Sequence, residues 1–349
     1  MSTTGEVPAE GVPEPRDPWA SPGTSGPPAV DPWAGWGPGS VAPRREPLPW
    51  PPPGMVFTEL MRLRARWWRP LLGLLFAAVA LIAFGVPILL GAAAVQYLRN
   101  GGPFDDTSLQ PDDPIGLLAN NLLLAALIPA SLLAVLLVHR LRPRFLMSIE
   151  GGLRWRLLPR LLLAALVVAG AFTVVTLPFA PLDTNDAGSA GHVAAMLAVV
   201  LISTPVQAAG EEFFFRGYLM QSLASWFASP RTGALVAGGI SSVLFALAHG
   251  TQGPALFIDR LVFGLVAAWL VWRTGGLEAG MALHVVNNLV SLALAVVTGA
   301  VSSALEPGDV GVLAALLDMT MMVTYAYVVH RWLARRGART TGEPAVVAQ

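Results

Sequence analysis

Long apolar stretches alternate with short polar connections along most of the chain. A helix that crosses a lipid bilayer needs about 20 mostly apolar residues, and eight stretches are of this kind. The connections between them hold most of the arginine, aspartate and glutamate. We therefore predict an all-α fold, a polytopic helical membrane protein with about eight transmembrane helices. The predicted spans are residues 71–98, 115–138, 157–179, 193–226, 233–249, 254–273, 277–297 and 310–333.

The N-terminal part of the chain lacks this pattern. Residues 1–54 are rich in proline, glycine and tryptophan and contain no apolar run, so we predict a disordered cytoplasmic tail. The tail repeats the sequence DPWA at residues 17–20 and 31–34. The repeat is either a docking motif for a cytoplasmic partner with an aromatic-lined groove or compositional drift. We expect residues 55–336 to form the membrane domain and residues 337–349 a second, short cytoplasmic tail.

Composition supports a membrane location and narrows the classes of function. Charged residues make up 13% of the chain and hydrophobic residues 54%, whereas an average soluble domain is roughly 25% charged. The 22 basic residues are balanced by 22 acidic ones, so we expect no broad positive surface and no nucleic-acid partner. The absence of cysteine excludes a disulfide framework, thiolate metal sites and a cysteine nucleophile.

The distribution of charge between the connections predicts the orientation. Arginines precede the first span, fill the second connection and follow the last span, whereas the first, third and seventh connections are acidic. Because cytoplasmic connections carry the excess of arginine, we predict a multi-pass protein of the plasma membrane with both termini in the cytoplasm. Arg99, at the outer end of the first span, is the exception. All basic residues are arginine, and alanine, glycine and proline are abundant, which favours a bacterial source with a GC-rich genome.

Three polar groups interrupt the apolar spans. A charged residue at the centre of a transmembrane helix costs about 2.5–3.5 kcal/mol on insertion scales, so each group needs a reason. Residues four apart share one helix face, and an acid that precedes arginine by four residues favours an ion pair. The groups are Gly210-Glu211-Glu212-Phe213-Phe214-Phe215-Arg216 in the fourth span, Phe245 and His249 in the fifth, and His284 and Asn288 in the seventh.

Helical rise predicts the depth of each group. Glu211 lies about 22 Å and His249 about 24 Å from the cytoplasmic ends of their spans, at 1.5 Å per residue. His284 lies only about 10 Å from the start of its span, unless the preceding turn at residues 274–276 dips into the membrane. Glu211 and His249 are therefore predicted to lie at similar depth in the membrane, and His284 is not.

These residue types suit the hydrolysis of an amide bond. A partly desolvated glutamate can accept a proton from water and return it to the leaving amine. A histidine can orient that water, and a second histidine with an asparagine can donate hydrogen bonds to the developing oxyanion. Alternatively, Glu211, His249 and His284 could be three ligands of a divalent metal such as zinc, with an open fourth position. The sequence leaves metal-activated and metal-free water both open.

The three motifs together resemble a known family, the CPBP family of intramembrane proteases. That family includes the CAAX prenyl proteases and the Abi-type proteins linked to bacteriocin immunity. The resemblance covers about residues 157–300, the motif-bearing core of the membrane domain. The motifs, in this order on separate spans, are Glu211-Glu212-x-x-x-Arg216, Phe245-x-x-x-His249 and His284-x-x-x-Asn288.

The resemblance implies a role for each motif residue. By the family pattern, Glu211 would activate water with His249, and His284 and Asn288 would stabilise the oxyanion. The family is described both as metalloprotease and as glutamic endopeptidase, so the resemblance does not decide whether a metal takes part. The supporting residues would be Glu212, Arg216 and Phe245.

We therefore predict an intramembrane endopeptidase that hydrolyses a peptide bond of a membrane-embedded or membrane-associated protein or peptide. Two other classes stay open. One is a non-enzymatic immunity or assembly protein that keeps the polar groups for helix packing, and the other is a proton-coupled transporter with Glu211 and the histidines as a proton relay. Elsewhere in the spans, we interpret Asp318 as a hydrogen-bond partner of a neighbouring helix, and Asp259 with Arg260 as an interfacial pair.

Overall fold

The part of the chain described by the computed structural model is residues 48–101, 109–177, 184, 186–305 and 310–336. Both DPWA repeats, most of the predicted 1–54 tail and the predicted 337–349 tail lie outside these described residues. The residues from Leu48 onward belong to one structural unit, which carries all three motifs.

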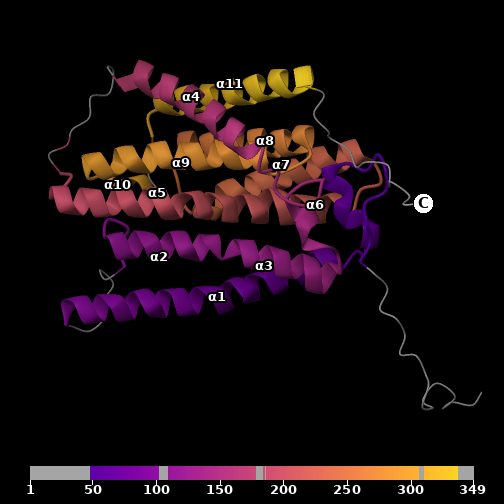
Figure 1. Ribbon diagram of the computed structural model, residues 1–349, viewed down its shortest axis with the longest axis horizontal. Helices are drawn as coiled ribbons and strands as arrows, with labels where there is room; N and C mark the ends of the chain where they lie inside the picture. Colours follow the sequence, from indigo (N-terminus) through magenta and orange to yellow (C-terminus); the bar gives the residue numbers. More distant parts are fainter. Residues whose placement is uncertain (1–47, 102–108, 178–183, 185, 306–309, 337–349) are drawn as a thin grey trace, which may run out of the picture. The chain divides into compact units, whose positions relative to one another are not determined.

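Helices build this unit (Figure 1). The long helices are α1 (Arg69–Asn100), α2 (Pro114–Ala125), α4 (Leu158–Thr176), α5 (Ala190–Glu212), α7 (Pro230–Ala248), α8 (Pro254–Thr274), α9 (Glu278–Thr298) and α11 (Val312–Arg336). The shorter elements are η1 (Phe57–Arg64), α3 (Leu127–Ala134), η2 (Val135–His139), η3 (Pro143–Leu146), η5 (Phe213–Leu219), α6 (Met220–Ala224) and α10 (Val301–Leu305). The described residues form no β-strand, and Ser148 and Gly276 form an isolated antiparallel bridge.

Eight helical segments are long and apolar enough to cross a membrane, which confirms the predicted fold class and span count for the described part of the chain. Two of these spans are composite. α2, α3 and η2 run together over Pro114–His139, and α5, η5 and α6 run together over Ala190–Ala224. The predicted ends differ from the observed ends by at most three residues, as at residue 193 against Ala190. Hydrophobic length alone therefore predicts these spans closely.

The fourth span changes its helix type where its charged residues lie. Pro205 interrupts the hydrogen-bond ladder of α5, because proline has no N–H to donate. Directly after Glu212, the chain forms the π-helix η5, which contains Arg216. π-helical turns are rare and occur frequently at functional sites. The irregular backbone thus coincides with the first motif.

Helix α9 lies inside the bundle and positions the third motif. It packs against α4, α5 and α8, and Figure 1 shows it between α5 and the layer of α4 and α11. α2 packs on α5, and small residues allow the two helices to approach closely. A methyl group added at Gly210 would collide with the carbonyl oxygen of Leu124. The glycine before Glu211 therefore lets α2 and α5 pack tightly beside the glutamate pair.

The turn between α8 and α9 is covered by another part of the chain. Residues 274–278 are all buried. The amide of Leu277 donates a hydrogen bond to the carbonyl oxygen of Met147 at 2.8 Å, within the segment that follows η3. α9 therefore begins beneath a layer of chain. His284, in the second turn of α9, consequently lies deeper in the protein than counting residues from the span end suggests.

Arg99, the exception to the predicted charge pattern, has an acidic partner. Its Nη2 donates to Oδ2 of Asp113 at 2.7 Å, and Oδ1 of Asp113 caps α2 by accepting from the amide of Ile115 at 2.8 Å. Partial burial raises the pKa of Asp113, but the hydrogen bonds from Arg99 and the α2 amides lower it more, so the pKa lies below its ordinary value. The ionised pair joins the ends of α1 and α2.

An ion pair fixes the start of α9. Arg154 donates to Glu278 through Nη2 at 2.6 Å and through Nε at 3.1 Å, and its Nη1 donates to the carbonyl oxygen of Thr274 at 2.9 Å. The Glu278 side chain is fully buried. The connection before α4 therefore holds both sides of the α8–α9 turn.

We predict that Arg154→Met destabilises the protein by about 3–5 kcal/mol, because it leaves the buried Glu278 carboxylate without its charge partner. The exposed Arg156 gives a matched control, and Arg156→Met should change stability by no more than about 0.5 kcal/mol. The measurement is the unfolding of both purified variants in detergent. Equal effects of the two substitutions would contradict the role of the ion pair.

Candidate active site

The first and third motifs meet at the imidazole of His284. Its Nδ1 lies 2.9 Å from Oε1 of Glu212, and its Nε2 lies 3.5 Å from Oε2 of Glu211. All three side chains are buried. Because the two glutamates end α5 and the histidine lies on α9, the ring joins the two helices at the motif residues.

The second motif lies against the same histidine. The ring centroid of Phe245, on α7, lies 5.8 Å from that of His284 and 4.8 Å from that of His249. His249 directly follows α7 and interacts electrostatically with Glu211. The structure thus places Phe245 in contact with both imidazoles, and His249 near enough to Glu211 to interact with its charge.

Glu212 and Arg216 form the ion pair that their spacing predicts. Nη1 of Arg216 lies 2.7 Å from Oε1 of Glu212, and both side chains are 0% exposed. Nε and Nη2 of Arg216 have no hydrogen-bond partner among the described residues. Instead, the guanidinium lies over aromatic rings, 4.3 Å from the centroid of Phe245 and 5.5 Å from that of Phe263. Cation–π contacts of this kind are strongest where water is excluded.

Hydrogen bonds at Nδ1 orient both histidines. Nδ1 of His249 donates to the carbonyl oxygen of Phe245 at 2.8 Å, and Nδ1 of His284 donates to Glu212 at 2.9 Å. A carbonyl or carboxylate oxygen can only accept, so Nδ1 carries the proton in each case. Nε2 of each ring is then the atom that remains for chemistry.

Glu211 has one occupied and one open oxygen. Oε1 accepts a hydrogen bond from Nε2 of Gln207 at 2.8 Å. Oε2 is buried and has no hydrogen-bond partner among the described residues. Buried polar atoms without a partner are costly and need an explanation. The open oxygen faces Nε2 of His284, which is where a water molecule would meet both groups.

Gln207 is the site residue that the sequence analysis missed. Besides Glu211, it contacts Asn288, whose Nδ2 donates to Oε1 of Gln207 at 3.2 Å. Through this contact Asn288, the fourth predicted catalytic residue, is linked to Glu211. The available signal was a polar side chain inside a span, four residues before Glu211 and therefore on the same helix face.

Comparison with known proteins bears on the region that holds all three motifs. Residues 190–290 match the family model described as type II CAAX prenyl endopeptidase Rce1-like. This segment of the chain is similar to that family. The match confirms the resemblance to the intramembrane protease family, and at the level of the family it supports a CAAX-type endopeptidase. The Abi-type affiliation stays a prediction.

A curated relative covers a similar length of chain. The uncharacterized protein YyaK of Bacillus subtilis (strain 168) is 35% identical over 96 residues. The alignment covers 27% of this chain and 32% of the relative, so the chain spans about a third of the length of the curated relative that it matches. No solved structure matches the chain.

The segment that matches the family model does not assemble the three-ligand metal site that the sequence left open. Among the described residues, no three histidine, cysteine, aspartate or glutamate side chains are close enough together to hold a metal ion. Glu211 and His284 lie in contact, but Nδ1 of His249 is bound to a backbone carbonyl. His249 does not complete a three-ligand group with them. As arranged, these side chains do not form the three-ligand metal site.

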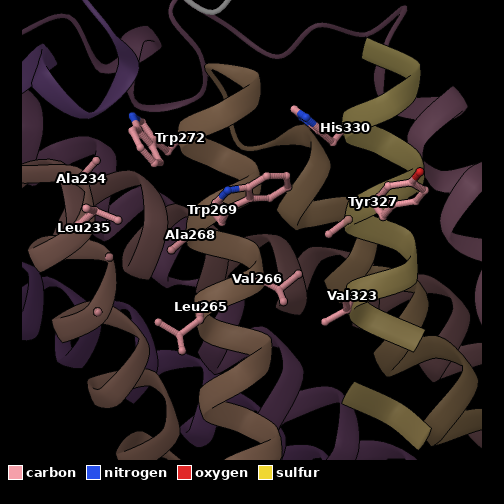
Figure 2. Close-up of a pocket in the computed structure, with 13 residues that line it drawn as sticks. Ala234, Leu235, Leu265, Val266, Ala268, Trp269, Trp272, Val323, Tyr327 and His330 are labelled. Atoms are coloured by element: carbon pink, nitrogen blue, oxygen red, sulfur yellow. The ribbon is translucent and has the colours of Figure 1, made fainter. Parts of the chain in front are cut away.

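A wide apolar cavity lies outside the candidate site. It has a volume of about 540 Å³ and lies between α7, α8 and α11 (Figure 2). Figure 2 shows Trp269, Trp272 and His330 gathered at one end and Leu265 and Val323 at the other. None of the motif residues lines this cavity. The cavity is therefore separate from the candidate active site formed by the three motifs.

Two further acids pair between helices. The carboxyl group of Asp318 on α11 interacts with that of Asp259 on α8, which agrees with the helix-to-helix contact expected for Asp318. Arg260 interacts electrostatically with Asp259, with which it was expected to form an interfacial pair. Its Nη1 donates to Oε1 of Gln252 at 2.6 Å, and the adjacent positions 259 and 260 face different directions on α8.

We predict that Arg216→Met destabilises the protein by about 3–5 kcal/mol, because the Glu212 carboxylate is then buried without its charge partner. The double variant Glu212→Gln/Arg216→Met removes both charges and should recover most of this loss. The measurement is the unfolding midpoint of wild type, both single variants and the double variant in detergent. Additive losses in this cycle would show that the two residues do not act as an ion pair.

Proposed function

We propose that this chain is an intramembrane endopeptidase in which Glu211 acts as the general base. The observation that supports it is the buried, unpartnered Oε2 of Glu211, which lies 3.5 Å from Nε2 of His284. Oε2 of Glu212 also has no hydrogen-bond partner among the described residues, but Oε1 of Glu212 is bound by Arg216 and His284. No arginine among the described residues forms an ion pair with Glu211, so its carboxylate is the one left for proton transfer. The match of residues 190–290 to an endopeptidase family supports the same reading.

The reaction would proceed through water activated at Oε2 of Glu211. Nε2 of His249, with its proton fixed on Nδ1, would accept a hydrogen bond from this water and orient it. Glu211 takes the proton as the water oxygen attacks the scissile carbonyl carbon, and later returns it to the leaving amine. Asn288 would donate an amide N–H to the oxyanion, and His284 would do the same from Nε2 when its ring carries a proton on both nitrogens.

The remaining motif residues hold these groups in place. Glu212 orients the His284 ring through Nδ1, and Arg216 neutralises Glu212 inside the span. Phe245 covers the guanidinium and provides the carbonyl that orients His249. The substrate would be a membrane-embedded or membrane-associated protein or peptide, because the reacting groups belong to membrane-spanning helices.

We predict that Glu211→Gln lowers the cleavage rate by about 10²–10⁴-fold, because an amide cannot accept the proton of the attacking water. The measurement is cleavage of a panel of membrane-associated peptides by purified protein in detergent or vesicles. Asp318→Asn is the matched carboxyl-to-amide control, since Asp318 interacts with Asp259 and not with the motif residues. It should keep the wild-type rate.

Two outcomes would contradict this assignment. Wild-type cleavage by folded Glu211→Gln would remove Glu211 as the base. Loss of cleavage in Asp318→Asn with full cleavage in Glu211→Gln would transfer the reaction to the aspartate pair. The same assay with a strong metal chelator distinguishes metal-activated from metal-free water. If Glu211 activates the water without a metal, the cleavage rate should not change.

We infer further that both ends of the described chain face the cytoplasm of a bacterial plasma membrane. The support is the concentration of arginine at the ends of helices that lie on one side of the bundle. The ion pair of Arg99 with Asp113 explains the single arginine at the opposite side.

We predict that, fused after residue 349, a reporter enzyme that works only in the cytoplasm is active and one that works only after export is inactive. Inserted at residue 186, between α4 and α5, the reporter that works only after export should be active and the cytoplasmic one inactive. Cells that carry each fusion in both reporter types provide the measurement. The opposite pattern at either position would overturn the orientation.

A further inference from the structure

We propose that Gln207 is a positioning residue that couples the general base to the oxyanion-stabilising asparagine. This inference rests on the proposed function, and it adds a residue outside the three motifs. One carboxamide makes both contacts: Nε2 donates to Glu211 at 2.8 Å, and Oε1 accepts from Asn288 at 3.2 Å.

The bond to Glu211 decides which carboxylate oxygen reacts. Gln207 and Glu211 are four residues apart on α5, so their side chains share one face. With Oε1 held by Gln207, the carboxylate cannot rotate freely, and Oε2 stays directed at His284. Without Gln207, both oxygens would be free to turn, and the productive orientation would be only one of several.

The bond to Asn288 fixes the oxyanion donor in the same way. An asparagine amide has two N–H donors, and Gln207 binds one of them. The plane of the Asn288 amide is thereby set, and its second N–H remains for the oxyanion. Because a carboxamide holds a donor and an acceptor in one rigid plane, glutamine can orient the base and the donor relative to each other.

The backbone that carries Gln207 is itself fixed. In the turn before it, Asn121 of α2 donates through Nδ2 to Oγ of Ser203 at 2.9 Å and to Oγ1 of Thr204 at 3.2 Å. Gln207 is only 5% exposed, so water cannot readily replace its partners. Both features favour a preorganised group, in which small displacements of a reacting atom are costly.

The test is the substitution Gln207→Met, which keeps the length of the side chain but removes the amide. We expect kcat to fall by about 10–100-fold, with KM within about twofold of wild type, because the substrate-binding surface is unchanged. Gln221→Met is the matched control. Gln221 is equally buried in the same span, but it donates to the carbonyl oxygen of Phe145, outside the site. It should keep the wild-type kcat.

A double variant separates positioning from simple helix packing. If Gln207 acts through Asn288, Gln207→Met/Asn288→Ala should lose little more than the larger of the two single losses, because residues that act as a unit are not additive. Losses in kcat that multiply would overturn the coupling. Gln207→Asn, which keeps a buried amide but draws it back by one methylene, provides a second variant that is easier to fold and should also lose kcat.

The outcomes distinguish this inference from the proposed function. If Glu211→Gln abolishes cleavage while folded Gln207→Met and Gln207→Asn keep the wild-type kcat, the role of Gln207 is refuted and the endopeptidase assignment stands. If Glu211→Gln cleaves like wild type, the assignment of the base fails, and with it the basis for a positioning role.

Discussion

One buried oxygen atom organises the candidate site. Oε1 of Glu212 accepts hydrogen bonds from Arg216 at 2.7 Å and from His284 at 2.9 Å. The first bond neutralises the carboxylate within a membrane-spanning helix, and the second sets which nitrogen of the imidazole meets Glu211. Because Glu212 is 0% exposed, solvent cannot take the place of either partner. The orientation of α9 and the charge balance of α5 thus depend on the same atom.

The two adjacent glutamates have different environments because successive residues on a helix point about 100° apart. Oε1 of Glu212 is bound by Arg216 and His284, and the guanidinium is covered by aromatic rings, while Oε2 of Glu212 has no hydrogen-bond partner among the described residues. Glu211 faces Gln207 and His284, and one of its oxygens remains open. Folding stability and chemistry are therefore assigned to neighbouring residues of the same type. This separation places the arginine on Glu212 and leaves Glu211 without an ion pair to arginine among the described residues.

The sequence predicts a large part of this arrangement. Hydrophobic length locates all eight spans of the described chain, and four-residue spacing predicts the pair of Glu212 and Arg216. These features are local, since a helix repeats every 3.6 residues and a span has a minimum length. The depth of His284 is not local. It depends on Met147, whose carbonyl binds the α8–α9 turn from a distant part of the chain.

Gln207 shows a different limit of sequence reasoning. A lone amide within a span is ordinarily a helix-packing residue, and its type and position resemble those of Asn121, which does serve packing between α2 and α5. Only the three-dimensional arrangement shows that Gln207 contacts two motif residues on different helices. For the same reason, no periodicity could pair Asp259 with Asp318, which come from different helices.

The clamp between Arg154 and Glu278 also constrains how the protein is made. The two residues are 124 positions apart, and the second lies at the start of α9. During synthesis, the arginine-bearing connection emerges and enters its compartment long before its partner exists, while chains grow at about 5–20 residues per second. The first two spans and this connection must therefore wait in the bilayer for about 6–25 s before Glu278 is made. Insertion of α9 brings His284 and Asn288 to the site, and α11 is added to the bundle afterwards.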